Sequence, residues 1–323
     1  MPAPDGRPPL IVLAGATATG KTGLSLALAG ELRARGVPAE IISADSRQVY
    51  RGMDIGTAKV SAEERARVPH HGLDLVDPDQ PFSVADYCAH AEQALAGIAE
   101  RAGVALLVGG TGFYLRAIAR GLATDELPWD REVRADIEAS LVADGLALLV
   151  GELRVLAPTR AATVDLRNPR RVVRALEIAR LAGDRPLPEP RGYGRPVLWL
   201  GLRAETPVLR DRIHRRAGAQ FKAGLVEETR GLASRFDTNA PSFTSIGYAE
   251  SLAFIAGRLT LEEAISGDAH RNVVFARRQA TWFRKEPDIT WLEATESLPL
   301  AEALRQVDRY LEQTPPRNAQ PIL

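Results

Sequence analysis

The stretch Gly15-Ala16-Thr17-Ala18-Thr19-Gly20-Lys21-Thr22 follows the apolar run Leu10–Ala14 and opens a helical pattern over residues 21–35. This order predicts a strand, a phosphate-binding loop and the first turn of a helix. The glycines let backbone N–H groups turn towards an anion, Lys21 adds a positive charge, and the Thr22 hydroxyl suits a bound Mg²⁺. We therefore expect residues 15–22 to bind a polyphosphate or diphosphate, with Thr22 as the metal ligand.

Strands and helices alternate in the rest of the chain. Further strands are expected at residues 39–44, 73–76, 104–108, 196–202 and 289–292, and helices at 83–101, 131–149, 170–181, 207–219, 225–235, 249–256, 261–266 and 270–284. Apolar strands joined by helices are typical of a parallel sheet covered on both faces. The sequence therefore predicts an α/β protein with a three-layer P-loop fold and a mainly parallel sheet, whose ligands lie at the carboxyl ends of the strands.

Strand patterns stop near Gly121 and resume at Pro196. We expect a first part of the core over residues 1–120, a mainly helical insertion domain over 121–195 and a second part of the core with C-terminal helices over 196–313. Residues 314–323 are expected to form a flexible tail.

The composition limits the class of protein. The 323 residues are 45% hydrophobic and carry a formal net charge of +0, which allows a sizeable core and gives no overall attraction to nucleic acid. Cys88 is the single cysteine, residues 1–9 contain no apolar signal segment, and no run of about 18 apolar residues occurs. We expect a cytoplasmic, non-membrane protein that works as a monomer, with Cys88 as a small buried side chain on a helix.

Asp45 directly follows the strand expected at 39–44 and so lies beside the phosphate loop. A carboxylate there is able to bind Mg²⁺, orient a nucleophile or remove its proton, or else to cap its own turn. The strand over 104–108 is followed by Gly109-Gly110-Thr111, without the acidic residue that a P-loop hydrolase uses for its metal. This argues against ATP or GTP hydrolysis, while Thr111 is a candidate hydrogen-bond donor and helix N-cap.

Several motifs together resemble the tRNA dimethylallyltransferases, also called tRNA isopentenyltransferases. Besides the loop at 15–22 they are Asp-Ser-x-Gln-x-Tyr-x-Gly-x-x-Ile-Gly-Thr-Ala-Lys at 45–59, Pro-His-His at 69–71, Gly-Gly-Thr-x-x-Tyr at 109–114, Ile-Gly-Tyr at 246–248 and Arg-Gln-x-Thr-Trp at 278–282. The resemblance covers nearly the whole chain, and its most specific part is the motif at 45–59.

The resemblance implies transfer of a dimethylallyl group from dimethylallyl diphosphate to N6 of the adenosine 3′ of the anticodon, in tRNAs that read codons beginning with U. It implies that Thr17–Thr22 hold the diphosphate with the help of Arg216, and that Asp45 accepts the N6 proton. Mg²⁺ is the implied cofactor. ATP is expected to bind the loop weakly at most and not to be the substrate.

Contacts to tRNA are implied for two sets of residues. The first comprises Asp45, Ser46, Arg47, Gln48 and Thr111; the second lies in the insertion and comprises Arg134, Arg167, Asn168, Pro169, Arg170 and Arg171. Ala217-Gly218 follow Arg216 where the family has larger residues, so the choice between Arg215 and Arg216 stays open.

Basic stretches support an RNA partner if they converge in space. Residues 158–180 carry six Arg against two acids, and residues 271–285 carry five basic side chains and no acid. Because Arg outnumbers Lys 37 to 4, each stretch alone is also explained as a solvated helix face. Two other classes stay open: a small-molecule or nucleotide kinase, and a non-catalytic RNA-binding protein switched by nucleotide.

Overall fold

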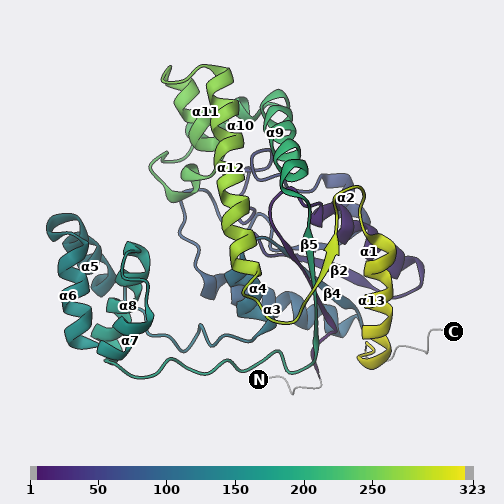
Figure 1. The fold of residues 1–323 in the computed structure, drawn as a ribbon, viewed down its shortest axis with the longest axis horizontal. Coiled ribbons are helices and arrows are strands. Elements are labelled where there is room, and N and C mark those ends of the chain that lie inside the picture. The colour runs from purple at the N-terminus through teal and green to yellow at the C-terminus, as the bar shows by residue number, and fades with distance from the viewer. Residues whose placement is uncertain (1–5, 317–323) are drawn as a thin grey trace. The chain divides into compact units, whose positions relative to one another are not determined.

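The computed structural model describes residues 6–316 and contains one six-stranded, all-parallel sheet (Figure 1). The strands lie in the order β3-β2-β4-β1-β5-β6. Their bounds are β1 Leu10–Gly15, β2 Ala39–Ser43, β3 His70–His71, β4 Val104–Gly109, β5 Val197–Arg203 and β6 Ile289–Glu293. The predicted α/β class with a parallel sheet is confirmed.

Helices cover both faces of this sheet because its central strands are apolar on both sides. In β1, Ile11 and Leu13 join the cluster that contains α1 (Lys21–Ala34) and α13 (Leu300–Gln313). The alternate residues Leu10, Val12 and Ala14 join the cluster that contains α3 (Val84–Glu100) and α4 (Gly112–Ala119). This alternation produces the three layers, since successive side chains of a strand point to opposite faces.

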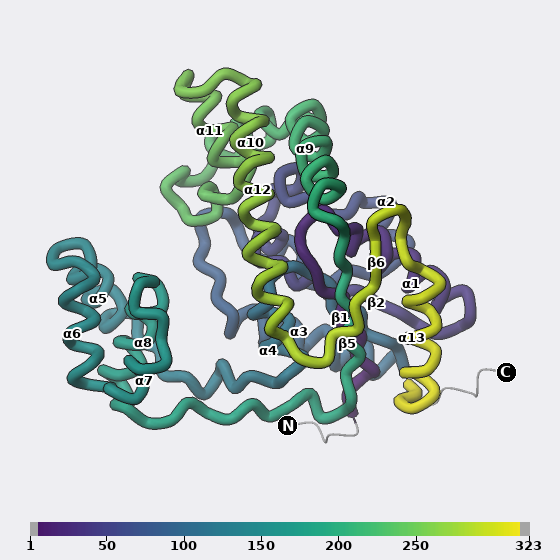
Figure 2. Tube along the Cα trace, in the orientation of Figure 1, coloured from purple at the N-terminus to yellow at the C-terminus, as the bar shows by residue number. Residues whose placement is uncertain are grey.

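A further group of helices follows β5, and Figure 2 traces the chain through it. It comprises α9 Thr206–Lys222, α10 Leu225–Ala233, the 3₁₀ helix Pro241–Thr244, α11 Tyr248–Ile255 and α12 Leu261–Phe283. These helices share a core cluster with Val49, Tyr50 and Met53, which belong to the loop after β2. The short helix α2 (Ala62–Arg67) ends this loop region.

The chain divides into two compact units, and the smaller one spans Leu122–Arg191. It contains α5 Arg131–Asp144, α6 Leu146–Leu156, α7 Pro158–Thr163 and α8 Pro169–Ala182. Ile137, Leu149, Leu153, Val172 and Leu176 are fully buried in a core of its own. The larger unit comprises the residues up to Gly121 and those from Gly192 onward.

Several elements differ from the prediction. The third strand is His70–His71 rather than 73–76, because the N–H groups of Leu75 and Val76 bond to the Val49 carbonyl instead of to β2. Helix α12 is continuous through Gly267, and the helix expected at 131–149 is interrupted at Gly145, whose φ is +82°.

The first residue of the expected tail is packed against the protein. Thr314 is buried and its hydroxyl donates to the Tyr310 carbonyl, so the chain is still packed at this residue. Residues 317–323 of the expected tail lie outside the described residues. In the described part of the chain, no helix is long and apolar enough to cross a membrane.

The larger unit closes on itself where the chain leaves and re-enters it. Gly121 has a φ of +62°, and a Cβ at this residue would lie 2.1 Å from the Gly192 carbonyl oxygen.

Gly121→Ala is therefore expected to lower the free energy of unfolding by about 2 kcal/mol or more, because it adds both backbone strain and a clash. Gly218→Ala on α9 is the matched control: nothing lies within 4 Å of the added Cβ, so we expect a gain of about 0.5 kcal/mol. Urea denaturation measures both, and equal effects would contradict the prediction.

Candidate active site

The loop between β1 and α1 has the geometry of an anion-binding turn. Gly20 is the N-cap of α1 with a φ of +94° and offers no side-chain cap, so N–H groups of the first helical turn are left for a ligand. Gly15 is required by crowding, because a Cβ there would lie 2.6 Å from the Leu202 carbonyl oxygen. Lys21 Nζ and Thr19 Oγ1 both donate to the Ala16 carbonyl, at 2.7 and 2.8 Å.

This loop forms one wall of a cavity of about 520 Å³ in the larger unit. The cavity lies where the carboxyl ends of β1, β2 and β4 meet, as expected for a parallel sheet. The residues that line it include Thr17, Ala18 and Gly20–Thr22; Asp45 and Gln48; Thr57–Val60 and Glu64; His70 and Leu73; Gly109 and Gly110; Arg212 and Arg216.

Lys21 is half-buried in this wall. Burial lowers its pKa from 10.5 to about 8, the Asp45 carboxylate acts in the opposite direction, and Arg216 lowers the pKa further. Two cations therefore face the cavity, and a bound anion would favour the charged form of the Lys21 ammonium.

The structure distinguishes Arg216 from Arg215. Arg215 is exposed and pairs with Asp211 at 2.6 Å, whereas Arg216 lines the cavity and donates from Nη2 to Asn272 Oδ1 at 3.2 Å. The Arg216 Nε atom is buried without a hydrogen-bond partner among the described residues. Burial lowers the pKa of Arg216, and the carboxylates of Asp268 and Asp45 oppose this shift. Arg216 is thus the side chain placed to meet an anion.

Asp45 lies in the same cavity and also holds its own turn. Its Oδ1 accepts the N–H of Arg47 at 2.8 Å. Asp45 therefore caps its own turn, one of the roles predicted from the sequence, and this hydrogen bond uses one carboxylate oxygen. The second oxygen makes no hydrogen bond to any described residue, which leaves it for a substrate.

Thr111 is held against this turn. The helix α4 begins after Thr111, but the Thr111 side chain makes no capping bond; its Oγ1 instead accepts the N–H of Ser46 at 3.1 Å. Thr111 is thus the N-cap residue of α4, as expected, but without a side-chain capping bond. The two loops touch because Gly109 has no side chain: a Cβ there would lie 2.1 Å from the Ala44 carbonyl oxygen.

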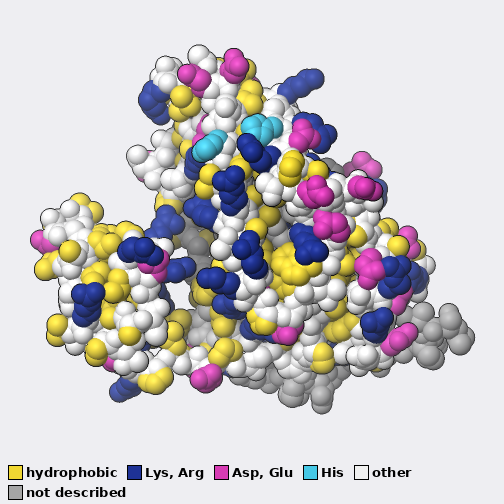
Figure 3. Space-filling model, in the orientation of Figure 1, with side chains coloured by type: hydrophobic (Ala, Val, Ile, Leu, Met, Phe, Trp, Pro, Cys, Tyr) yellow, Lys and Arg dark blue, Asp and Glu magenta, His cyan; other side chains and the backbone are white. Residues whose placement is uncertain are grey.

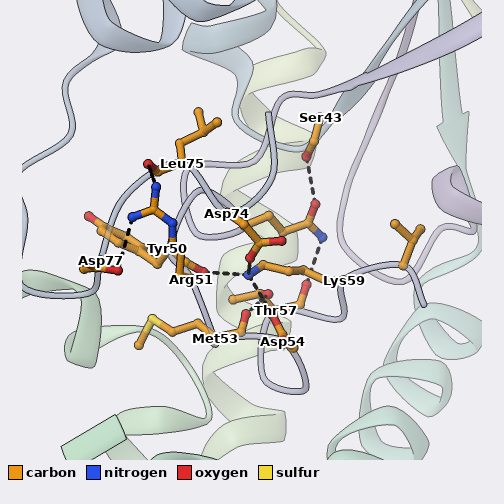
Figure 4. Close-up of polar contacts among 12 residues, drawn as sticks. Ser43, Tyr50, Arg51, Met53, Asp54, Thr57, Lys59, Asp74, Leu75 and Asp77 are labelled. Carbon is orange, nitrogen blue, oxygen red and sulfur yellow. Dashed lines mark hydrogen bonds and ion pairs between the residues drawn. The ribbon is translucent and has the colours of Figure 1, made fainter. Parts of the chain in front are cut away.

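The motif at 45–59 builds the opposite wall through its own polar contacts (Figure 4). Lys59, 1% exposed in its side chain, donates to the Tyr50 carbonyl, Asp54 and Asp74 at 2.6, 2.8 and 2.5 Å. Gln48 accepts from Ser43 and donates to the Thr57 carbonyl, at 2.8 and 3.0 Å. Both ends of the Gln48 amide are thus engaged within the protein, so this residue shapes the cavity.

The predicted RNA residues of the insertion lie within the smaller unit. Arg134 pairs with Glu138 and Glu177 at 3.0 and 3.3 Å, and Asn168 caps α8 by accepting the N–H of Arg171. Pro169 occupies the first turn of α8, and Arg167, Arg170 and Arg171 are exposed. Arg170 and Arg171 form no ion pair with the described residues. Arg167 lies 3.5 Å from Asp165, so the two guanidinium groups without an ion pair to a described residue are those of Arg170 and Arg171.

The larger unit carries a second basic surface. Lys and Arg side chains gather over α12 in Figure 3, and Arg277, Arg278, Arg284 and Lys285 are exposed there. Phe283, by contrast, is fully buried and belongs to the core. Sequence reasoning assigned no role to two buried residues of α12, Asn272 and Gln279, although the Arg-Gln-x-Thr-Trp motif drew attention to the second.

The histidines and acids of the described residues form no cluster able to hold a metal by themselves. His71 contacts Glu40 at 2.7 Å and His70 contacts the Val68 carbonyl at 2.7 Å, so both imidazoles take part in contacts within the protein.

Comparison with known proteins agrees with the motifs. The family model for IPP transferase matches residues 48–286. The tRNA dimethylallyltransferase of Roseiflexus castenholzii is 44% identical over 92% of this chain and 97% of its own length; that of Thermus thermophilus is 44% identical over 87% and 91%. The solved tRNA isopentenylpyrophosphate transferase of Bacillus halodurans is 38% identical, with a TM-score of 0.70 over 94% of this chain and 97% of its own. The chain belongs to the tRNA dimethylallyltransferase (IPP transferase) family.

Proposed function

We propose that this protein transfers the dimethylallyl group of dimethylallyl diphosphate to N6 of the adenosine 3′ of the anticodon, in tRNAs that read codons beginning with U. The products are N6-isopentenyladenosine and diphosphate. One observation carries the proposal: a single cavity combines a phosphate loop, two partly buried cations whose pKa is lowered by desolvation, and a carboxylate with one oxygen that bonds to no described residue.

The leaving group fits the cationic wall. When the allylic C–O bond breaks, the electron pair stays on the diphosphate, so negative charge grows on its oxygens. Lys21, Arg216 and the N–H groups at the start of α1 stabilise that charge more strongly in the transition state than in the ground state. The charges are already in place, so no reorganisation opposes the reaction.

The acceptor fits the opposite wall. Adenine N6 is a weak nucleophile because its lone pair is delocalised into the ring. Asp45, through the oxygen not used by Arg47, accepts the N6 proton as the new C–N bond forms. Thr111 and Ser46 hold the turn that aims this carboxylate.

Mg²⁺ fits the same site. The Thr22 hydroxyl is exposed and makes no hydrogen bond to a described residue, and Mg²⁺ is commonly held by one or two protein oxygens together with phosphates and water. When bound by Thr22 it would neutralise part of the charge of the diphosphate.

We propose that tRNA is recognised by its backbone. The exposed Arg167, Arg170 and Arg171 of the smaller unit, with Arg134, bind the anticodon stem-loop, and Asp45–Gln48 lie around the target base. A neutral chain needs such local patches to attract RNA.

Asp45→Asn is expected to lower turnover by about 10²-fold or more and to leave tRNA affinity nearly unchanged. Asparagine keeps an oxygen for the Arg47 N–H, so the turn survives while the proton acceptor is lost. Asp237→Asn is the matched control, since Asp237 Oδ1 accepts the N–H of Asn239 in an exposed turn. Single-turnover kinetics with nucleoside mass analysis measure both variants. Near-normal turnover of Asp45→Asn would refute the assignment.

Diphosphate affinity is expected to fall as pH rises through about 8, where unliganded Lys21 loses its proton. A bound anion favours the charged ammonium, so binding above this pH must take up a proton, at a cost of up to about tenfold in affinity per pH unit. The stability of the fold changes with pH in the opposite direction to diphosphate affinity. Burial of the charged ammonium lowers this stability below about pH 8, and the loss is relieved as the pH rises further.

Calorimetry of dimethylallyl diphosphate binding between about pH 7 and about pH 9.5 tests this dependence. Lys21→Met should bind more weakly at neutral pH and show a flat profile in the alkaline range. An unchanged alkaline slope in Lys21→Met would show that another group is responsible.

Replacement of Arg167, Arg170 and Arg171 together by Gln is expected to weaken tRNA binding and to reduce the slope of log K against log salt by about one per lost phosphate contact at most. Turnover at saturating tRNA should change little. The control replaces the exposed Arg33, Arg305 and Arg309 of the larger unit and so removes the same charge. Salt titrations that overlay for the two triple variants would exclude these residues as an RNA contact.

A further inference from the structure

Helix α12 carries a buried polar face beside the cavity. Asp268, Asn272 and Gln279 are 1%, 9% and 6% exposed, and their spacing of four and seven residues places them on one side of the helix. Figure 1 shows α12 running from α11 towards α4 and the sheet. Polar side chains at such depth are expected to serve a defined hydrogen-bonding role.

Small residues bring this face close to the phosphate loop. Ala269 and Ala276 of α12 pack in one cluster with Ala16 of the loop and Ala217 of α9. Alanine at each contact lets the helix approach the backbone of the loop, so that longer polar side chains of the same face reach it.

Gln279 joins two walls of the cavity. Its Oε1 accepts the N–H of Thr17 at 2.8 Å, and its Nε2 donates to the Gly110 carbonyl at 3.0 Å. The orientation of the amide is determined, because one partner only donates and the other only accepts. A Cβ at Gly110 would lie 2.1 Å from Gln279 Nε2, so a side chain there would displace the Gln279 amide. The Thr17 N–H therefore donates to Gln279 and is not available for a hydrogen bond to the diphosphate.

Asn272 holds the side chain of Arg216. Its Oδ1 accepts from Arg216 at 3.2 Å, while its Nδ2 donates to Asp268 Oδ1 at 2.6 Å. A guanidinium only donates and a carboxylate only accepts, so the Asp268 carboxylate orients the Asn272 amide with its oxygen towards Arg216. The guanidinium is thereby held in place before any ligand arrives.

We propose that α12 positions the diphosphate site from behind: Gln279 fixes the phosphate loop against the loop after β4, and Asn272, oriented by Asp268, fixes Arg216. Both are positioning residues that do not touch the reacting atoms. The inference rests on the proposed function, because it takes the cavity as the diphosphate site.

Binding of inorganic diphosphate by calorimetry tests the inference, together with KM values for both substrates. Gln279→Met is expected to raise the Kd for diphosphate and the KM for dimethylallyl diphosphate about tenfold, and to change the KM for tRNA less than about twofold. The control is Gln220→Met. Gln220 is also buried, at 8% exposed, and donates to the carbonyls of Ile55 and Gly56, so its loss should lower the Tm without changing diphosphate affinity.

A double-mutant cycle separates the two positioning residues. Asn272→Ala should weaken diphosphate binding about tenfold in the native background and have almost no effect in Arg216→Gln, which still binds through Lys21. Gln279→Met should keep its full effect in Arg216→Gln. Asp268→Asn retains an acceptor for Asn272 and should cost less than about threefold. Asn272→Leu, which preserves volume, serves if the alanine variant does not fold.

The outcomes are distinct. Native affinity in Gln279→Met, or an Asn272→Ala effect that persists undiminished in Arg216→Gln, would overturn the positioning roles. If the unaltered protein fails to bind diphosphate, the proposed function fails instead.

Discussion

The close approach of backbones at the carboxyl ends of β1, β2 and β4 is the constraint on which the site depends. A side chain at Gly109 would collide with the Ala44 carbonyl, and one at Gly15 with the Leu202 carbonyl. Because these positions are glycine, the phosphate loop, the Asp45 turn and Thr111 meet around one cavity. A single added methyl group would separate the walls that the chemistry requires to be adjacent.

The site stores electrostatic free energy. Lys21 and Arg216 are desolvated by the fold, and burial lowers the pKa of both. An isolated buried cation is unfavourable, and neighbouring carboxylates relieve this only in part. In the proposed function a diphosphate completes the pairing, so the cost carried by the free protein would become affinity for the leaving group and for the charge that grows on it during the reaction.

Residues outside the cavity determine how well this arrangement is held. Two side chains of the 45–59 motif are engaged within the protein. Gln48 donates to a backbone carbonyl of the motif, and Lys59 donates to Asp54 and Asp74. Sequence motifs of this family therefore mark structural supports as well as groups that contact substrate. Helix α12 also supports the cavity through side-chain hydrogen bonds to backbone groups, and Gln279 is the clearest case.

The sequence alone determined the α/β class, the phosphate loop, the Asp45 turn and the family, because these depend on local patterns: apolar strands, glycines at fixed spacing and a long specific motif. It misplaced β3, since a strand of two residues depends on its partner and carries almost no pattern of its own. It also divided α12 at Gly267, where packing against α11 maintains the helix. Only the tertiary structure separated Arg216 from Arg215 and brought Gln279 to Thr17, residues 262 positions apart. Such contacts depend on how helices pack on the sheet, and the spacing of residues in the sequence does not reveal this packing.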